Sequence, residues 1–391
     1  MKLRNVYLIN LSFGLAGIER RFANLWHVLR TRGNVRPILV VPDTMAQILH
    51  EADLADPKDD LLWVVPEHPF LRASDKLRLP PFGKTVLAIL RSRAVAWGGY
   101  QSVWDHIHKD PSAVIHIGMN CSALRPPNVP IVYECVDSTL TQLGKRHFIR
   151  AAARPSIIHC QTERIRIALE QTMARRRTHW TTVTSPCCFA SYPITKPARK
   201  RDPQLVAFVG RLSPEKNPLL FIDAIAQVRS TGVACRGLIL GEGPLLSDVR
   251  RSILHLGLDS AIEVGFSDRP VERLEEVSVF VSLQSGDNYP SQSLLEAMGA
   301  GCAIVATDVG ETRQIVNNEV GLVVKPDISD VAGAILSLVK DPELARVMGS
   351  AAARLVRTRH TADNYAAFVE SLYDRAVEAY RSASVSAIDT Q

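Results

Sequence analysis

The sequence predicts an α/β protein with two Rossmann-like domains, each built around a parallel sheet. Three observations indicate this class. Short apolar runs rich in β-branched residues alternate with stretches of helical periodicity along the whole chain, which is typical of βα units. The 391 residues exceed the length that a single hydrophobic core usually serves. A segment rich in Pro, Lys and Arg separates two series of these units.

The strands are expected in two series. In the N-terminal series they are the runs VYLINL, RPILVV, LLWVV, AVIHIG, PIVYECV, SIIHCQ and WTTVTS. In the C-terminal series they are LVAFVG, RGLILG, AIEVGF, VFVSLQ, AIVATD and GLVVKP. Such nearly continuous apolar runs predict strands that are covered on both faces.

Four segments follow from this order. We expect an N-terminal domain over residues 1–189, a linker over 190–204 and a C-terminal domain over 205–365. Residues 366–391 are expected to form a helix that returns to the first domain, followed by a tail. The stretch NYAAFVESLYDRAVEAY in this region carries apolar residues at helical spacing.

The composition narrows the class of protein. With 46% hydrophobic and 22% charged residues, the chain has the profile of a soluble globular protein. No apolar run reaches the roughly 18 residues of a membrane helix. The first residues resemble a signal peptide, but Asn10 and the helical pattern after it favour a strand, a loop and a helix. Seven cysteines without a C-x-x-C pair indicate a reducing, cytoplasmic location, and Cys187 and Cys188 are expected to pack rather than bind metal.

The charge is distributed unevenly. Residues 1–200 hold 28 Lys and Arg against 15 Asp and Glu, whereas the remainder holds 18 against 25. The basic half favours an anionic membrane, a phosphorylated substrate or nucleic acid as a partner, with a merely solvated surface as the alternative. No nucleic-acid-binding motif accompanies the charge. Segment 68–100 mixes basic and apolar residues and predicts either an interfacial helix or an ordinary amphipathic one.

The strongest local pattern is VAFVGRLSPEKNPLLFIDAI, residues 206–225. A buried strand ends at Gly210, a tight loop carries Arg211 and Lys216, and a helix is expected from about Pro214. Ligands of open α/β sheets bind at the carboxyl ends of the strands, so the two cations stand where a phosphate would bind. Isolated cations are more often surface residues, but the order of strand, loop and helix favours a site.

Two further strand ends carry candidate residues. Gly241, Glu242 and Gly243 begin a loop whose amides could approach a ligand. Leu246 takes the place of the third glycine of a dinucleotide fingerprint, so this is only a weak sign of NAD binding. Glu263, which could bind a ribose in a dehydrogenase, lies inside an expected strand and is interpreted as structural.

Asp287, Asn288 and Tyr289 follow another expected strand, and a helix is expected over residues 291–300. Glu296 lies one to two turns inside this helix. Its carboxylate could accept two ribose hydroxyl hydrogen bonds. The alternative is a solvent-exposed glutamate, which is the usual state of a helical Glu.

In combination, GRLSPEKNP, GEGP and SGDNYPSQSLLEAMGAG followed by IVATDVGE resemble the C-terminal domain of the family 4 retaining glycosyltransferases with the GT-B fold. The resemblance covers about residues 204–345. The N-terminal half is similar more loosely, through SFGLAGIERRFANL, VYECVDST and SIIHCQTERIRIAL. The resemblance implies two facing Rossmann-like domains with a nucleotide-sugar cleft between them.

This resemblance also implies a function. A sugar would pass from a UDP- or GDP-sugar to an acceptor hydroxyl with retention, without a metal or another cofactor. The resemblance assigns binding of the nucleotide-sugar donor to the following residues: Gly17, Gly210, Arg211, Lys216, Glu242, Gly243, Val264, Phe266, Asp287, Asn288, Tyr289, Pro290, Ser291, Ser293 and Glu296.

Within that set the resemblance implies separate roles. Arg211 and Lys216 would hold the diphosphate and act in catalysis, while Glu296 would hold the ribose. Gly17 would offer backbone contact to the phosphates. Residues 264–266 would contact the base, and residues 287–291 the transferred sugar.

The sequence departs from the family pattern at two positions. Asn288 stands where the first glutamate of the paired-glutamate motif is usual, in a variant with Asp287 before it. Val136 stands where many members have a histidine before Asp137. Asp137 and His116 are candidates for the acceptor side, with a buried strand-end histidine as the commoner explanation for His116.

Other functions stay open at this point. An NAD-dependent oxidoreductase, a sugar-nucleotide epimerase and a non-catalytic GT-B partner subunit are the alternatives, while the intact trio of Arg211, Lys216 and Glu296 favours the transferase. The acidic stretch 51–60 lacks the strand-flanked D-x-D of a metal-dependent transferase and is interpreted as a solvated helix end. The basic half fits an acceptor that is a glycan, a lipid-linked molecule or a small molecule. The reaction would then serve bacterial surface polysaccharide or glycolipid synthesis at the inner face of the membrane.

Overall fold

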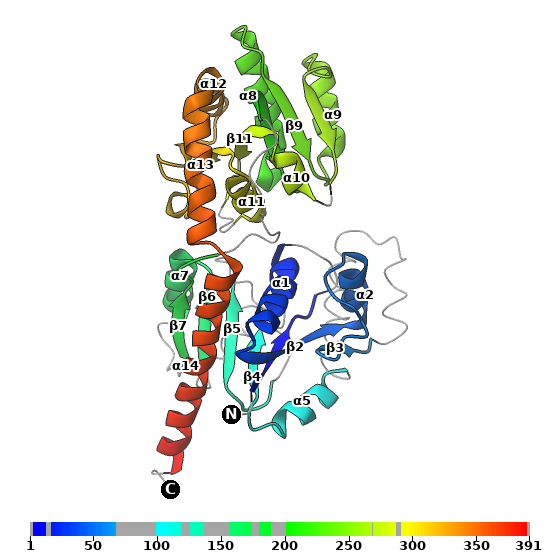
Figure 1. Cartoon of the computed structure of the whole chain (residues 1–391), viewed down its shortest axis with the longest axis vertical. Coiled ribbons are helices and arrows are strands. Elements are labelled where there is room, and N and C mark those ends of the chain that lie inside the picture. Colours follow the sequence, from blue (N-terminus) through cyan, green and yellow to red (C-terminus); the bar gives the residue numbers. More distant parts are fainter. Residues whose placement is uncertain are drawn as a thin grey trace. The chain divides into compact units, whose positions relative to one another are not determined.

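The computed structural model describes residues 3–12, 17–67, 99–118, 126–136, 156–173, 180–188, 201–267, 269–286 and 291–388. The chain divides into two units, which are described separately (Figure 1). Unit 1 contains residues 1–186 and 362–391, and unit 2 contains residues 187–361. The chain therefore crosses between the units twice.

Unit 1 is built on a seven-stranded sheet in the order β3-β2-β1-β4-β5-β6-β7, with all described pairs parallel. Its strands are β1 (Arg4–Ile9), β2 (Val35–Pro42), β3 (Leu62–Val65), β4 (Val114–Ile117), β5 (Ile131–Cys135), β6 (Ser156–Cys160) and β7 (Trp180–Thr184). Its described helices are α1 (Gly17–Arg32), α2 (Asp43–Glu51), α5 (Gln101–His108), α7 (Glu163–Met173) and α14 (Ala362–Ile388).

The last helix, α14, completes one face of the unit 1 sheet. It packs against α1 and strands β4, β5 and β6 (Figure 1). Six of its side chains have no solvent exposure and recur at helical spacing: Tyr365, Ala366, Val369, Leu372, Tyr373 and Ala376. The helix therefore returns to the N-terminal domain, and it starts at Ala362 rather than at the expected residue 366.

Unit 2 is built on a six-stranded parallel sheet in the order β10-β9-β8-β11-β12-β13. Its strands are β8 (Asp202–Val209), β9 (Arg236–Leu240), β10 (Ile262–Gly265), β11 (Val277–Ser282), β12 (Ala303–Thr307) and β13 (Gly321–Val324). Its helices are α8 (Pro218–Ser230), α9 (Leu246–His255), α10 (Pro270–Leu274), α11 (Gln292–Ala300), α12 (Ile328–Lys340) and α13 (Pro342–Thr358), with short 3-10 turns at Pro214–Lys216 and Thr312–Gln314.

Helices cover both faces of the unit 2 sheet. One core joins the sheet to α8, α9 and α12, and the other joins it to α10, α11 and α13. The strand order reverses between β8 and β11, which makes a topological switch point where the loops after these two strands diverge.

All thirteen expected strands are confirmed. Two details differ from the sequence prediction. Strand β8 begins at Asp202, so residues 202–204 of the expected linker belong to the sheet. The helix expected near Pro214 is a single 3-10 turn, because Asn217 adopts a left-handed conformation (φ 58°) before α8 starts at Pro218. No described helix is long and apolar enough to cross a membrane. Residues 68–98, most of the possible interfacial segment, lie outside the described residues.

Candidate functional site

The loops after β8 and β9 are joined backbone to backbone at the switch point of unit 2. The Gly210 amide donates to the Leu240 carbonyl (3.0 Å), and the Leu212 amide donates to the Glu242 carbonyl (2.8 Å). A Cβ atom on Gly241 would collide with the Gly210 carbonyl, and one on Gly243 with the backbone of Leu212. These glycines are therefore required by close packing of the two loops.

Arg211 and Lys216 extend from this joined pair of loops. Arg211 is exposed and Lys216 is half-buried. Burial lowers the pKa of Lys216 to about 8, and the charge of Glu215 opposes this shift. The Glu215 carboxylate instead accepts a hydrogen bond from the Ser213 hydroxyl (2.6 Å). Within the described residues, no acidic side chain forms an ion pair with Arg211 or Lys216, so their charges are available to an anion.

The loop after β11 meets the same edge. The Ser285 amide donates to the Glu215 carbonyl (3.0 Å), which fixes the end of β11 against the cation-bearing loop. Gln284, which the sequence prediction missed, is 8% exposed, and its Oε1 atom lacks a hydrogen-bond partner among the described residues. Its only sequence signal is its position directly after a buried strand. Residues 287–290, which hold the expected contacts Asp287, Asn288, Tyr289 and Pro290, lie outside the described residues.

Glu296 is buried in α11. Only 4% of it is exposed, and its neighbours Leu294, Leu295 and Ala297 belong to the core of that face. The alternative of a solvent-exposed glutamate is therefore wrong. Ser291, just before the helix, is also buried, and its hydroxyl lies 3.3 Å from that of Ser293. The switch-point edge thus combines two cations, which have no acidic partner among the described residues, with the buried carboxylate of Glu296 on α11.

The end of β10 presents an aromatic side chain. Phe266 is 61% exposed directly after the strand, whereas Val264 is half-buried within it. The Gly241 amide donates to the Gly265 carbonyl (2.9 Å), which keeps this strand end beside the glycine loop. Glu242 is exposed on that loop. An exposed ring beside the glycine loop offers a flat apolar surface to a planar ligand.

In unit 1 the expected residues fall in different places. Gly17 is the first residue of α1, so its amide has no acceptor within the helix itself. Asp137 lies outside the described residues, which stop at Val136 in this region. His116 is fully buried on β4, where its Nδ1 atom is 2.9 Å from the hydroxyl of Tyr373 on α14. This placement favours the buried strand histidine over an acceptor contact.

His116 belongs to a polar network that the sequence prediction did not identify. Three neighbouring strands each direct one polar side chain toward α1 and α14: His116 from β4, Glu134 from β5 and His159 from β6, all with no exposure. His116 Nε2 lies 3.4 Å and His159 Nδ1 3.6 Å from Glu134 Oε1. Arg21 of α1 binds both carboxylate oxygens, at 3.2 and 2.6 Å. Burial would raise the pKa of Glu134, but the charge of Arg21 and the two histidines hold it well below its usual value.

The three groups His116, Glu134 and His159 lie close enough together to hold a metal ion. Arg21 already neutralises Glu134, however, and burial lowers the pKa of His159, which favours the neutral imidazole. A divalent cation would therefore add two uncompensated charges to a site without solvent exposure, which is strongly unfavourable. The charge balance therefore disfavours a metal ion here, although His116 Nε2 and both ring nitrogens of His159 lack a hydrogen-bond partner among the described residues.

The structure also brings a histidine to the adjacent cysteines. His360 Nδ1 lies 3.3 Å from Cys188 Sγ, although the two residues are 172 positions apart in sequence. Cys187 and Cys188 are buried, at 7% and 3% exposure, which confirms that they pack in the core.

Comparison with known proteins finds a family match in the C-terminal part of the chain. Residues 194–355 match the family described as Glycosyl transferases group 1. The chain is 30% identical over 164 residues to an alpha-D-kanosaminyltransferase of Streptomyces kanamyceticus, which covers 41% of this chain and 42% of that protein. It is 35% identical over 160 residues to a D-inositol 3-phosphate glycosyltransferase of Nocardia farcinica, covering 37% and 35%. The match spans less than half the length of either relative.

The fold likeness extends over both units. A mutant of Staphylococcus aureus TarM, solved in complex with fondaparinux, alpha-GlcNAc-glycerol and UDP, matches 97% of this chain and 100% of its own, with a TM-score of 0.70 and 13% identity. The chain therefore has the GT-B type of α/β fold that the sequence predicts.

Proposed function

We propose that this chain, whose residues 194–355 match the glycosyl transferases group 1 family, is a retaining glycosyltransferase. It moves a sugar from a UDP- or GDP-sugar to an acceptor hydroxyl. The observation that carries the proposal is the pair Arg211 and Lys216, two cations without an acidic partner among the described residues, at the switch point of a parallel sheet.

The reaction proceeds by charge stabilisation of the leaving group. Arg211 and Lys216 hold the donor diphosphate and compensate the negative charge that grows on it as the bond to the anomeric carbon breaks. The acceptor oxygen bonds to the anomeric carbon on the same face, and its proton passes to a phosphate oxygen of the leaving nucleoside diphosphate. This scheme needs no protein nucleophile, metal ion or other cofactor.

The remaining donor contacts follow the same edge of unit 2. The buried carboxylate of Glu296 accepts the ribose hydroxyls, since a carboxylate away from water forms stronger hydrogen bonds. Val264 and the exposed ring of Phe266 contact the base. Gly210, Glu242, Gly243 and the Gly17 amide border the phosphates, while residues 287–291 with Ser293 contact the sugar. UDP in the related TarM structure supports a uridine donor.

The acceptor binds to the N-terminal domain. The excess of basic residues in positions 1–200 fits an anionic acceptor, such as a lipid diphosphate, at the inner face of the cytoplasmic membrane. Asp137 is the acceptor-side candidate. The relatives named above are glycosyltransferases of bacteria, which supports a role in bacterial polysaccharide or glycolipid synthesis.

The direct test measures binding and slow hydrolysis across a panel of UDP-, GDP- and ADP-sugars. We expect one donor to bind and hydrolyse selectively, and Glu296→Gln to weaken that binding while keeping the shape of the side chain. Glu343→Gln is the matched control, since Glu343 is exposed on α13 and forms a surface ion pair with Arg346.

Other outcomes separate the alternatives. Release of a changed sugar nucleotide without acceptor would identify an epimerase, binding of NAD an oxidoreductase, and no binding of any nucleotide a non-catalytic subunit. The proposed binding to an anionic membrane is tested by flotation of the protein with neutral and anionic liposomes. Equal recovery of the protein with both kinds of liposome would contradict binding to an anionic membrane surface.

A further inference from the structure

The carboxyl end of β11 carries a buried carboxamide. Gln284 lies two residues past Ser282, the last residue of this strand, and is 8% exposed. Its Nε2 atom donates to the Ser282 hydroxyl (3.0 Å), whereas its Oε1 atom has no hydrogen-bond partner among the described residues. A buried oxygen without a hydrogen-bond donor costs free energy, so its presence at this position needs an explanation.

The main chain around Gln284 is fixed on both sides. The Thr307 hydroxyl at the end of β12 donates to the Gln284 carbonyl (2.7 Å), and the Ser285 amide donates to the Glu215 carbonyl (3.0 Å). Gln284 is thus held between the end of a neighbouring strand and the loop that carries Lys216. The unpaired oxygen therefore has a fixed position at the switch-point edge of unit 2.

Alternation along β11 assigns Gln284 to one face of the sheet. Leu283 belongs to the core formed with α8, α9 and α12, whereas Phe280 belongs to the core formed with α10, α11 and α13. Ser282 and Gln284 follow the register of Phe280, and the hydrogen bond between their side chains confirms that they share a side. Gln284 therefore lies on the face that α11 covers, the helix that carries the buried Glu296.

The chemistry of this edge indicates the kind of ligand that would pair with Gln284. An amide oxygen accepts hydrogen bonds and cannot donate one, so it requires a hydroxyl or an N–H group. The adjoining loop carries Arg211 and Lys216, neither of which has an acidic partner among the described residues. A ligand that combines phosphate groups with hydroxyl groups satisfies both features, and a sugar nucleotide is such a ligand.

We infer that Gln284 binds the sugar nucleotide directly, an assignment that rests on the proposed glycosyltransferase function. Its Oε1 atom accepts a hydrogen bond from a hydroxyl group of the ligand, on the ribose or on the transferred sugar. The argument uses residues of unit 2 alone. Because the oxygen is buried, a ligand that lacks this hydroxyl leaves it unpaired, so Gln284 contributes to selectivity as well as to affinity.

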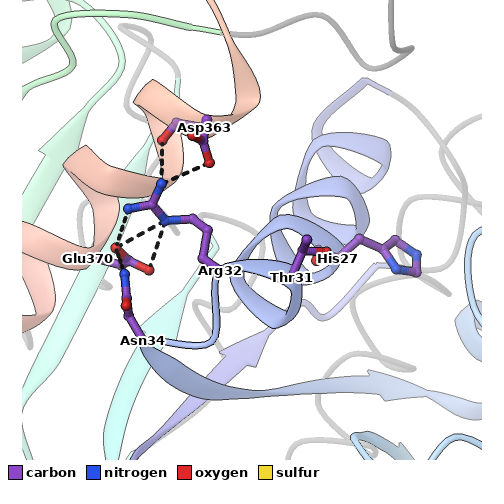
Figure 2. A network of polar contacts seen from close by, with 6 residues as sticks. All are labelled: His27, Thr31, Arg32, Asn34, Asp363 and Glu370. Atoms are coloured by element: carbon purple, nitrogen blue, oxygen red, sulfur yellow. Dashed lines mark hydrogen bonds and ion pairs between the residues drawn. The ribbon is translucent and has the colours of Figure 1, made fainter.

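The test compares three variants of the full chain. Gln284→Met keeps the length of the side chain and removes its amide, and Ser282→Ala removes the hydroxyl that orients this amide. Asn34→Ala is the matched control, because Asn34 is an exposed carboxamide of unit 1. Its Nδ2 atom donates to Glu370 (3.0 Å), beside the ion pair of Arg32 (Figure 2).

Dissociation constants are measured by calorimetry for UDP, its 2′-deoxy and 3′-deoxy forms and UDP-glucose, with the matching series of GDP and GDP-mannose if the wild type prefers guanine. We expect Gln284→Met without ligand to melt at or above the wild-type temperature, since an unpaired buried oxygen is removed. Its affinity for the sugar nucleotide should fall about 10-fold. Ser282→Ala should lose less, and Asn34→Ala should bind as the wild type does.

The ligand series identifies the hydroxyl group. If it belongs to the ribose, the wild type should discriminate against one deoxy form, and Gln284→Met should lose about 10-fold of that discrimination. If it belongs to the transferred sugar, Gln284→Met should bind the free nucleotide normally and lose only the additional affinity for the sugar nucleotide. Either pattern is a coupling between one side chain and one ligand group, which a general change of the fold would not produce.

Unchanged affinity ratios among the four ligands in Gln284→Met would overturn the inference and leave Gln284 a structural residue. An equal loss of affinity in Asn34→Ala would do the same. Failure of the proposed function gives a different result, because the wild type itself then binds neither series, and the assignment of Gln284 falls with it. Binding by the wild type together with unchanged selectivity in Gln284→Met refutes the role of Gln284 alone.

Discussion

The half-buried ammonium of Lys216 makes diphosphate binding depend on pH. Its pKa of about 8 means that the ammonium fraction falls from about 0.9 at pH 7 to about 0.5 at pH 8 and about 0.1 at pH 9. If only the ammonium form binds a diphosphate, the affinity for UDP should fall about tenfold between pH 7 and pH 9, or about 1.4 kcal/mol. A lysine at its ordinary pKa of 10.5 would give almost no change over this range.

Binding should therefore take up protons. At pH 8 about half of the Lys216 side chains are neutral in the free protein, so UDP binding should draw about half a proton per site from the buffer. Isothermal titration calorimetry at pH 8 in two buffers of different ionisation enthalpy measures this number directly.

Two variants serve as controls in this experiment. Lys216→Met should abolish the proton uptake near pH 8 and leave only the titration of UDP itself. Arg211→Ala should bind more weakly but keep the uptake, because arginine does not titrate in this range. Equal proton uptake in the wild type and Lys216→Met would refute the reasoning, since the titrating group would then lie elsewhere.

The same lysine affects stability with a definite sign. Its pKa is lower in the folded state, about 8, than the value of 10.5 that applies when it is exposed, so the unfolded chain binds more protons between these values. The free energy of unfolding contributed by this group is therefore lowest below pH 8 and rises as the pH increases toward 10.5. The difference between wild type and Lys216→Met in urea denaturation isolates this contribution from other titrating groups.

Three further predictions concern both units. Arg211→Ala and Lys216→Ala should each reduce turnover about 100-fold, on the order of 3 kcal/mol, in a steady-state assay with the preferred donor, and near-normal turnover in both would remove their assigned roles. Gly241→Ala should weaken UDP binding and lower the melting temperature in calorimetry, because the new methyl group collides with the Gly210 carbonyl, and a variant that binds UDP normally would contradict the close packing of these loops. A thiol reagent should label at most one of the seven cysteines in the native protein, since six are buried and burial raises the pKa of Cys235 to about 12 and of Cys302 to about 11; rapid labelling of more would show that these thiols are accessible.

The strands were predictable from sequence because parallel strands covered on both faces must be apolar throughout. The runs IVYEC and SIIHC show this pattern apart from Ser156 at a strand start and one ionisable polar residue inside each strand, Glu134 and His159, which the register pairs on the same face of the sheet. That signal was present for Glu134 and His159. Arg21 could not be paired with them from sequence, since the pairing depends on how α1 packs across three strands.

The candidate site in unit 2 was predictable in part. The positions of Arg211 and Lys216 at a strand end follow from the order of strand, loop and helix in the local sequence. The structure adds that the loops after β8 and β9 are joined by backbone hydrogen bonds. The burial of Glu296 had a readable signal, because the segment LLEAMGA is apolar on every side of the helix except at this residue. The contact of Cys188 with His360 had none, since nothing local indicates that the two segments meet.

The route of the chain determines the order in which the protein can mature during synthesis. The sheet of unit 1 is translated by residue 186, yet one of its faces is closed by α14, which begins at Ala362. At 5 to 20 residues per second, the ribosome adds the intervening segment in about 10 to 40 seconds. During that interval His116, Glu134 and His159 lack the helix that covers them, while unit 2 can fold without waiting. The domain that starts first is therefore completed last, and a nascent chain stalled before residue 362 would present an unfinished sheet to chaperones.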